Sequence, residues 1–96
     1  MITFNELLER TKSNDIAIHT PTEDQAKALL NELNKKGYKW NSGDKLTTMI
    51  LYGDYKEDTC YYTLEPNNRI CYGSLSFYQE NDYTIVEFKD IDFKEE

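Results

Sequence analysis

The sequence predicts a single α+β domain over residues 1–96, in which a short N-terminal helix, a strand and an amphipathic helix precede a mostly antiparallel sheet. The clear helix start signals and the apolar residues at helical spacing lie within residues 1–40. Beyond them, short runs rich in β-branched and aromatic residues alternate with turn residues. Because the strands are concentrated after the helices, we expect the helices to pack on one face of the sheet.

The first helix is expected over residues 4–12. Thr3 and Glu6 form a capping box, in which each side chain accepts a hydrogen bond from the backbone N–H of the other residue. The apolar face of this helix consists of Phe4, Leu7, Leu8 and Thr11. Polar residues 13–15 end the helix, and residues 15–19 then alternate in the manner of a strand.

The second helix is expected over residues 21–36. Thr20 stands as its N-cap, Pro21 occupies the first helical position and Glu23 completes the capping pattern. Its apolar face consists of Ala26, Leu29, Leu30 and Leu33. Gly37 supplies the left-handed residue that ends the helix.

Short strands are expected to follow at residues 38–40, 47–53, 59–64, 69–73 and 83–88. Residues 65–68 form a hairpin turn between two of them. We expect residues 54–58 to be an acidic loop and residues 74–80 to be an edge segment or a short helix. The first strand, the second helix and a later strand would form a parallel crossover unit, which would make the sheet mixed.

Negative charge and tyrosine are concentrated in the same half of the chain. Residues 1–48 hold seven lysine or arginine residues and seven aspartate or glutamate residues, whereas residues 49–96 hold four and eleven. The whole net charge of −7 therefore belongs to the second half, which also holds seven of the eight tyrosines. Such a surface repels nucleic acids and membranes and attracts basic partners.

The remaining composition is that of an ordinary globular protein. No apolar run is long enough to span a membrane, and the first residues lack the basic-then-apolar pattern of a signal peptide. We therefore expect a cytoplasmic protein in which Cys60 and Cys71 stay reduced. Direct binding of nucleic acid is not expected, because aromatic strands that stack bases also need a positive groove. The oligomeric state is left open.

Residue types that catalyse reactions are present, but they form no recognisable catalytic motif. His19 is the only histidine; it lies at a strand end ahead of a helix, and an edge histidine bonded to nearby backbone accounts for it. Two cysteines and one histidine match no zinc spacing, and residues 54–58 lack the ligand spacing of a calcium loop. The sequence therefore predicts no enzymatic activity, no catalytic residue, no metal and no cofactor.

Binding of a protein partner is the remaining interpretation. Tyrosine is enriched in interface hot spots, because it gives a large contact area and a polar tip at low entropic cost. Carboxylates on the same strands would copy the charge pattern of a nucleic-acid backbone. The alternative is that these carboxylates only keep the protein soluble. The predicted contact face covers residues 52–65 and 78–92. Its expected contact residues are Asp54, Tyr55, Glu57, Asp58, Glu80, Asp82, Glu87 and Asp90.

An alternative interpretation is a protein that sequesters a small ligand, such as a nucleotide signal of host immunity. Tyr38 and Trp40 would stack on the ligand, and Lys39 would bind the negative charge of the ligand. Packing of Trp40 against the second helix explains the same residue without a ligand. A third interpretation is a structural module that only oligomerises.

Three segments form a pattern: residues 21–27 (PTEDQAK), Leu29-Leu30 and residues 37–43 (GYKWNSG). Strands that bear tyrosine and cysteine, and the closing residues 83–88 (YTIVEF), extend it. This pattern, over roughly residues 15–90, resembles that of small proteins of phages and prophages of Gram-positive bacteria. Small acidic phage proteins often antagonise host defence, as anti-CRISPR and anti-restriction proteins do, and some of them mimic DNA. The resemblance implies a defence inhibitor and transfers no functional residue.

These features together predict a non-enzymatic phage or prophage inhibitor that binds a basic host protein. The partner would handle nucleic acid, and a CRISPR effector nuclease is the sharpest candidate. A phage-encoded protein of this kind would act in the cytoplasm of the host cell.

Overall fold

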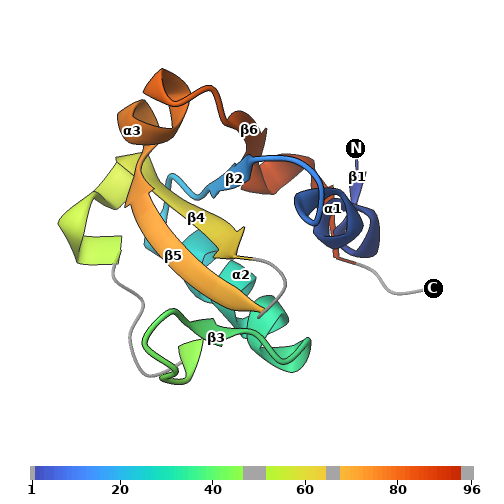
Figure 1. Ribbon diagram of the computed structural model, residues 1–96. Coiled ribbons are helices and arrows are strands. Elements are labelled where there is room, and N and C mark those ends of the chain that lie inside the picture. The colour runs from blue at the N-terminus through green and yellow to red at the C-terminus, as the bar shows by residue number, and fades with distance from the viewer. Residues whose placement is uncertain (1, 47–51, 65–67, 94–96) are drawn as a thin grey trace.

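A computed structural model describes residues 2–46, 52–64 and 68–93. In chain order the elements are β1 (Ile2–Thr3), α1 (Phe4–Thr11), β2 (Ile16–His19), α2 (Glu23–Lys35), β3 (Lys39–Trp40), the 3₁₀ turns η2 (Tyr52–Asp54) and η3 (Lys56–Asp58), β4 (Thr59–Leu64), β5 (Arg69–Ser74), α3 (Leu75–Glu80), β6 (Thr84–Glu87), the 3₁₀ turn η4 (Phe88–Asp90) and β7 (Ile91–Asp92). The strands form a five-stranded sheet in the order β3-β5-β4-β2-β6 and a separate β1-β7 pair. The predicted α+β class is confirmed (Figure 1).

Both predicted helices form, but the second begins later than expected. The Thr3 hydroxyl caps α1 by accepting a hydrogen bond from the Glu6 N–H at 3.1 Å, as predicted. Thr22, instead of Thr20, caps α2, and its hydroxyl accepts from the Gln25 N–H at 3.2 Å. Thr20 is buried, and its N–H and hydroxyl both donate to the Thr59 carbonyl, at 3.0 and 3.3 Å. Contact with the sheet therefore decides which threonine caps the helix.

The five-stranded sheet is mixed, as the crossover pattern predicted. β4 and β5 form an antiparallel hairpin whose register runs from Thr59↔Ser74 to Leu64↔Arg69. β2 adds to β4 in antiparallel orientation. The two edge strands then add in parallel: β6 to β2, and β3 to β5.

Alternation along the strands divides the interior into two clusters. Ile16, Ile18 and Tyr61 face the main core, which also holds the apolar faces of α1 and α2. Ala17 and Cys60 point to the opposite face, where they meet Tyr78 of α3. The two predicted helices thus pack on one face of the sheet, as expected, and α3 covers the other. α3 can lie on this second face because Gly73 of β5 has no side chain. The Tyr78 ring packs directly over Gly73, and a side chain at that position would leave the ring too little room.

The observed strands differ from the predicted ones in several of their bounds. Residues 47–51 of the predicted strand 47–53 lie outside the described residues, and Tyr52 and Gly53 belong to η2. Residues 65–67 of the predicted hairpin turn also lie outside them, although the flanking strands pair as expected. β1 and β7, which pair in parallel through Ile2↔Ile91, were not predicted, because two-residue strands carry no periodic signal.

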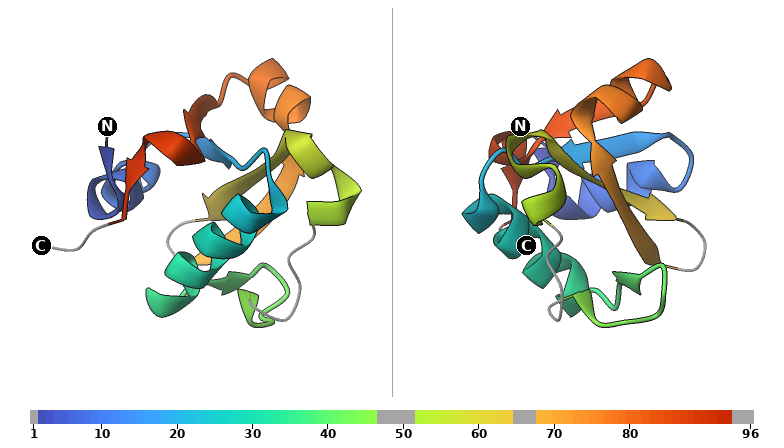
Figure 2. Two further views of the ribbon diagram at one scale, coloured as in Figure 1. Left: turned by 180° about the vertical axis from the view of Figure 1, so that it is seen from behind. Right: turned by 90° about the vertical axis from the view of Figure 1, so that its left-hand side faces the viewer.

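The β1-β7 pair and the residue 52–58 segment lie on different sides of the molecule. Figure 2 shows β1, β7 and α1 together on one side, while η2 and η3 lie on the other. Within residues 2–46, 52–64 and 68–93, no helix has both the length and the apolar character needed to cross a membrane. The fold thus leaves η2 and η3 as a separate feature beside the ends of β4 and β5.

Candidate functional site

Residues 54–58, called the acidic turn below, are an exposed segment formed by the end of η2 and by η3. Asp54, Tyr55, Glu57 and Asp58 are all exposed, so four of the expected contact residues lie on one short segment. Lys56 lies among them with a φ of 51°, in the left-handed region that costs a non-glycine residue about 1 kcal/mol. A backbone in this state persists only where its surroundings hold it.

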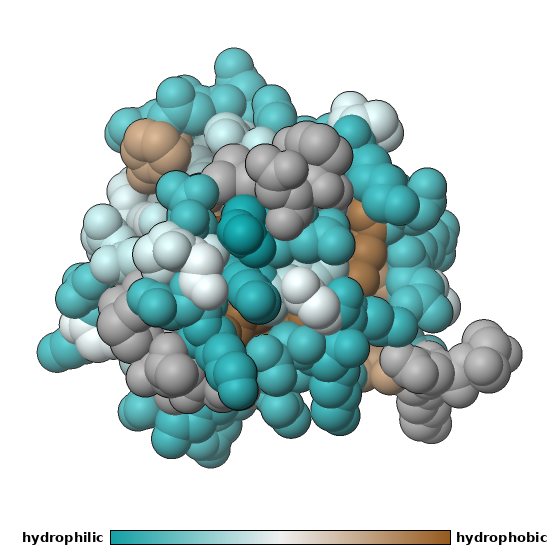
Figure 3. Space-filling view, turned by 60° about the horizontal axis from the view of Figure 1, so that its bottom comes forward, coloured by the Kyte–Doolittle hydropathy of each residue, from teal (hydrophilic) through white to brown (hydrophobic). Residues whose placement is uncertain are grey.

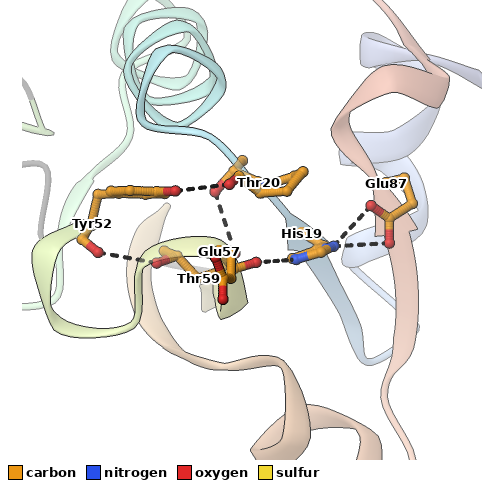
Figure 4. Close-up of polar contacts among 7 residues, drawn as sticks. His19, Thr20, Tyr52, Glu57, Thr59 and Glu87 are labelled. Carbon is orange, nitrogen blue, oxygen red and sulfur yellow. Dashed lines mark hydrogen bonds and ion pairs between the residues drawn. The ribbon is translucent and has the colours of Figure 1, made fainter.

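The first half of the acidic turn is held by two tyrosines. The Tyr52 hydroxyl donates to the Pro21 carbonyl at 2.7 Å, which ties η2 to the segment ahead of α2 (Figure 4). The Tyr72 hydroxyl of β5 donates to the Asp54 carboxylate at 2.6 Å. This hydrogen bond to Asp54 is the main cause that raises the pKa of Tyr72, because ionisation of the phenol would place two negative groups in contact.

The second half of the acidic turn is held by His19. Its Nε2 lies 2.6 Å from the Glu57 carbonyl oxygen, and its Nδ1 lies 2.8 and 3.0 Å from the two Glu87 carboxylate oxygens (Figure 4). A carbonyl and a carboxylate both accept hydrogen bonds, so each ring nitrogen of His19 faces an acceptor. One ring therefore joins β2, β6 and η3, and its side chain is only 12% exposed.

Cys60, His19 and Glu87 are adjacent across three strands, which is the order of a nucleophile, a base and an orienting group. The geometry does not activate the thiol. His19 directs Nε2 to the Glu57 carbonyl. Cys60 is fully buried, and burial raises the pKa of its thiol to about 12, with Glu87 and Asp58 adding to the effect. A thiol with this pKa is protonated at neutral pH and is a poor nucleophile.

The remaining expected contact residues do not form one surface with the acidic turn. Glu80 ends α3 and Asp82 follows it; both are exposed, and the Thr59↔Ser74 pair places the start of α3 next to the end of the turn. Glu87 is half-buried against His19. Asp90 lies near α1, where it lines a cleft of about 400 Å³ with Ile2, Glu6 and Arg10. The predicted face therefore divides, because Asp90 lies beside α1 instead of beside the acidic turn.

The residues of the ligand-binding alternative are mostly interior. Tyr38 and Trp40 are 5% and 4% exposed and belong to the main core, whereas Lys39 is exposed. The Trp40 ring lies 6.0 Å from the rings of Tyr61 and Tyr72. Stacking of a ligand on Trp40 would require the ring to leave these partners.

Large exposed hydrophobic side chains are few in the described part of the chain: Tyr55 is 41% exposed and Phe77 is 52% exposed. Figure 3 shows one face covered mostly by hydrophilic residues, with apolar colour in small separate areas. Tyr55 lies within the acidic turn, and its ring is 5.8 Å from that of Tyr72. Tyr55 is therefore an exposed aromatic side chain that packs against Tyr72 and has carboxylates beside it in the chain.

Sequence reasoning missed the residues that hold the turn. It treated His19 as an edge histidine bonded to backbone, which the Glu57 carbonyl contact matches, but it did not foresee Glu87 as the second partner. The sequence predicts no structural role for Tyr52 or Tyr72, whereas both donate hydrogen bonds to other segments. Contacts across tens of residues leave no local pattern, so no signal in the sequence would have found them.

Within the described residues, no cluster of three or more histidine, cysteine, aspartate or glutamate side chains is arranged to hold a metal ion. Comparison of the chain with protein-family models, with curated proteins and with solved structures finds no match. The resemblance to phage proteins therefore stays a prediction, and the acidic turn with its supports is the structural basis for a proposed function.

Proposed function

We propose that the chain is a non-enzymatic binding protein whose acidic turn, with Tyr55 as its aromatic anchor, engages a basic surface of another protein. The observation that carries this proposal is that the turn is exposed and held at the same time. Its side chains face solvent, while Tyr52, Tyr72 and His19 fix its backbone or its first carboxylate. Carboxylates that serve solubility alone need no such supports, whereas a pre-organised segment loses less entropy on binding.

The chemistry of the turn favours a nucleic-acid-handling partner. Three carboxylates on a fixed backbone present negative groups at short spacing, as a phosphate backbone does, and the net charge of −7 favours association with a basic groove. Inhibition would follow because the turn occupies the groove that the nucleic acid needs. Together with the phage-like sequence pattern, this makes a CRISPR effector nuclease of a bacterial host our specific candidate.

The test is an affinity pull-down from host lysate at low and at high salt, with the partner then purified for titration. Reversing Asp54, Glu57 and Asp58 to lysine should abolish binding, and high salt should weaken binding of the unchanged protein, because salt screens the charges. The matched control reverses Glu6, Glu9 and Asp90, which changes the net charge equally on the side near α1 and should retain the partner. Unchanged affinity in the first variant would remove the acidic turn as the contact surface.

Tyr55 offers a second measurement on the same complex. Tyr55→Ala should weaken binding by at least about tenfold, since a central aromatic hot spot contributes about 2 kcal/mol or more. Phe77→Ala is the comparison, because it removes the other exposed aromatic ring and leaves the acidic turn intact. Equal affinity of the Tyr55→Ala variant and the unchanged protein would leave charge alone to explain the contact.

The nucleotide-binding alternative has less support, because Tyr38 and Trp40 are core residues. Thermal unfolding in the presence of nucleotides tests it directly, since a ligand that binds only the folded state raises the melting temperature. A rise with any nucleotide, together with unchanged behaviour of the acidic-turn variant, would favour a ligand site over a protein contact.

A further inference from the structure

Among the described strands, β6 forms an edge of the sheet with outward-pointing backbone groups. It comes last in the sheet order, next to β2 alone. The Thr84 N–H donates to the Asp15 carbonyl at 2.8 Å, and the parallel register pairs Thr84 with Ile16 and Val86 with Ile18. In a parallel ladder, alternate residues direct their backbone groups to the neighbouring strand. Thr84 and Val86 therefore bond to β2, while the N–H groups of Ile85 and Glu87 point away from the sheet.

The residues of β6 do little to protect this edge. Proteins usually protect an exposed edge by a charged side chain, a proline, a bulge or a very short strand. β3, at the opposite edge, has only two residues, one of which is Lys39. β6 is Thr84-Ile85-Val86-Glu87, with three β-branched residues and one charge, and that charge is paired with His19. The edge is thus suited to accept another strand.

We propose that β6 takes up an extended, lysine- or arginine-bearing segment of the partner by strand addition. In this binding mode, backbone hydrogen bonds give affinity and alternate side chains give specificity. On one face the added residues would lie beside Ile85 and Glu87, where a basic side chain is favoured. On the other face they would lie beside half-buried Val86, where an apolar side chain is favoured. The segment therefore alternates basic and apolar residues.

A second copy of this chain is a poorer occupant of the edge. Two copies would each carry a net charge of −7, which opposes their association. An edge of four residues also buries far less than the roughly 1,200 Å² that specific interfaces need. A basic segment gains from the charge and extends its contact beyond β6. The acidic turn lies close to this edge, because His19 contacts both Glu87 of β6 and the Glu57 carbonyl.

The test uses a short peptide in which lysine and valine alternate, titrated into the full chain while backbone amides are followed by NMR and hydrogen exchange. The Ile85 and Glu87 amides should gain protection, whereas those of Thr84 and Val86 should not change, because they are already bonded to β2. A peptide with alternate N-methylated residues, which cannot donate to the edge, and a peptide with glutamate in place of lysine should both fail. Protection at other residues, or no protection at saturating peptide, would overturn the proposal.

Ile85→Pro removes one outward N–H without taking a bond from β2, and Ile85→Ala is its matched control because it keeps that N–H. Peptide binding should weaken by at least about tenfold in the proline variant and persist in the alanine variant. Circular dichroism establishes that each variant is folded, and the N-methylated peptide gives the same test on the unchanged chain. Equal binding by both variants, with N-methylation also without effect, would reject strand addition.

The basic character of the segment rests on the proposed function, but the two proposals fail separately. Loss of the natural partner in the acidic-turn reversal, with retention in Ile85→Pro, would keep the proposed function and reject the edge. The opposite result would keep the edge and reject the acidic turn as the contact surface. For the peptide probe, the acidic-turn reversal should still show protection at Ile85.

Discussion

The His19 side chain contacts two segments that are far apart in the sequence. Its Nδ1 contacts Glu87 of β6, and its Nε2 contacts the backbone of Glu57, which is 38 residues away in the chain. Because the second contact is to backbone, the identity of the Glu57 side chain does not matter for holding the turn. The Glu57 carboxylate therefore stays exposed to solvent while the backbone of the same residue is held.

Replacement of His19 by alanine should loosen the acidic turn more than the rest of the protein. We expect a loss of about 2 kcal/mol in the free energy of unfolding, since hydrogen bonds to charged groups contribute about 1.5–3 kcal/mol. Amides of residues 56–58 should exchange faster, as measured by hydrogen exchange. Lys12→Ala, which removes only the exposed pair with Glu9, should change stability by less than about 0.5 kcal/mol. Unchanged exchange in the turn would contradict the role given to His19.

At the scale of elements, α3 depends on the sheet. Six residues are too few for a stable isolated helix. The Ser74 hydroxyl caps α3 by accepting a hydrogen bond from the Phe77 N–H at 3.2 Å. Tyr78 packs on Gly73 and against Tyr83, and the rings of Tyr78 and Tyr83 lie 4.9 Å apart. The absence of a side chain at Gly73 is what allows this helix to lie close to β5.

Gly73→Ala should therefore displace Tyr78. The added methyl group would lie 3.1 Å from Cε2 of Tyr78 and 3.3 Å from its hydroxyl oxygen, closer than ordinary contact. We expect a loss of about 1–3 kcal/mol in the free energy of unfolding, measured with urea, because overpacking forces side chains out of place. Gly53→Ala is the matched control, since no atom lies within 4 Å of its added methyl group. Equal stability of the two variants would mean that α3 moves freely.

The elements that the sequence predicted best are those that carry their own signals. α1 and the C-terminal part of α2 have amphipathic spacing and caps, and β4 and β5 alternate clearly. The start of α2 was misplaced because Thr20 and Thr22 both suit a cap, and only the contact with Thr59 distinguishes them. The acidic turn was located from its composition, but its supports come from β2, β5 and the segment before α2, which only the folded chain brings together.

At the scale of the whole molecule, the tyrosines are divided between interior and surface. Tyr61 and Tyr78 are buried, and Tyr62 is half-buried against Tyr83, at a ring distance of 4.9 Å. The concentration of tyrosine in residues 49–96 therefore reflects two clusters on the two faces of the sheet as well as the surface around Tyr55. Composition alone does not separate these uses, because adjacent residues on a strand point to opposite faces.

Burial of these groups predicts a loss of stability at alkaline pH. Burial is the main cause that raises the pKa of Cys60 from 9.0 to about 12 and that of Tyr62 from 10.0 to about 12; the pKa values of Tyr61 and Tyr78 are raised as well. Above about pH 9, the unfolded chain loses these protons while the folded chain keeps them. Stability is therefore fully present below that pH and falls as the pH rises toward 12.

Urea unfolding across this pH range measures the effect, and tyrosinate absorbance reports ionisation in the same samples. The fall should be shallower in Tyr62→Phe, which keeps the ring and removes one ionisable group. Absorbance of the folded protein that rises fully at pH 10, ahead of unfolding, would contradict the raised pKa values.

The parallel pairing of β1 with β7 has a practical consequence for tethering the molecule. Ile2 lies opposite Ile91, so a fluorophore or surface linker attached beside either of these two residues leaves from the same side of the molecule (Figure 1). That side lies away from η2 and η3. A molecule tethered to a sensor chip or a resin beside Ile2 or Ile91 would therefore have its acidic turn on the side away from the tether.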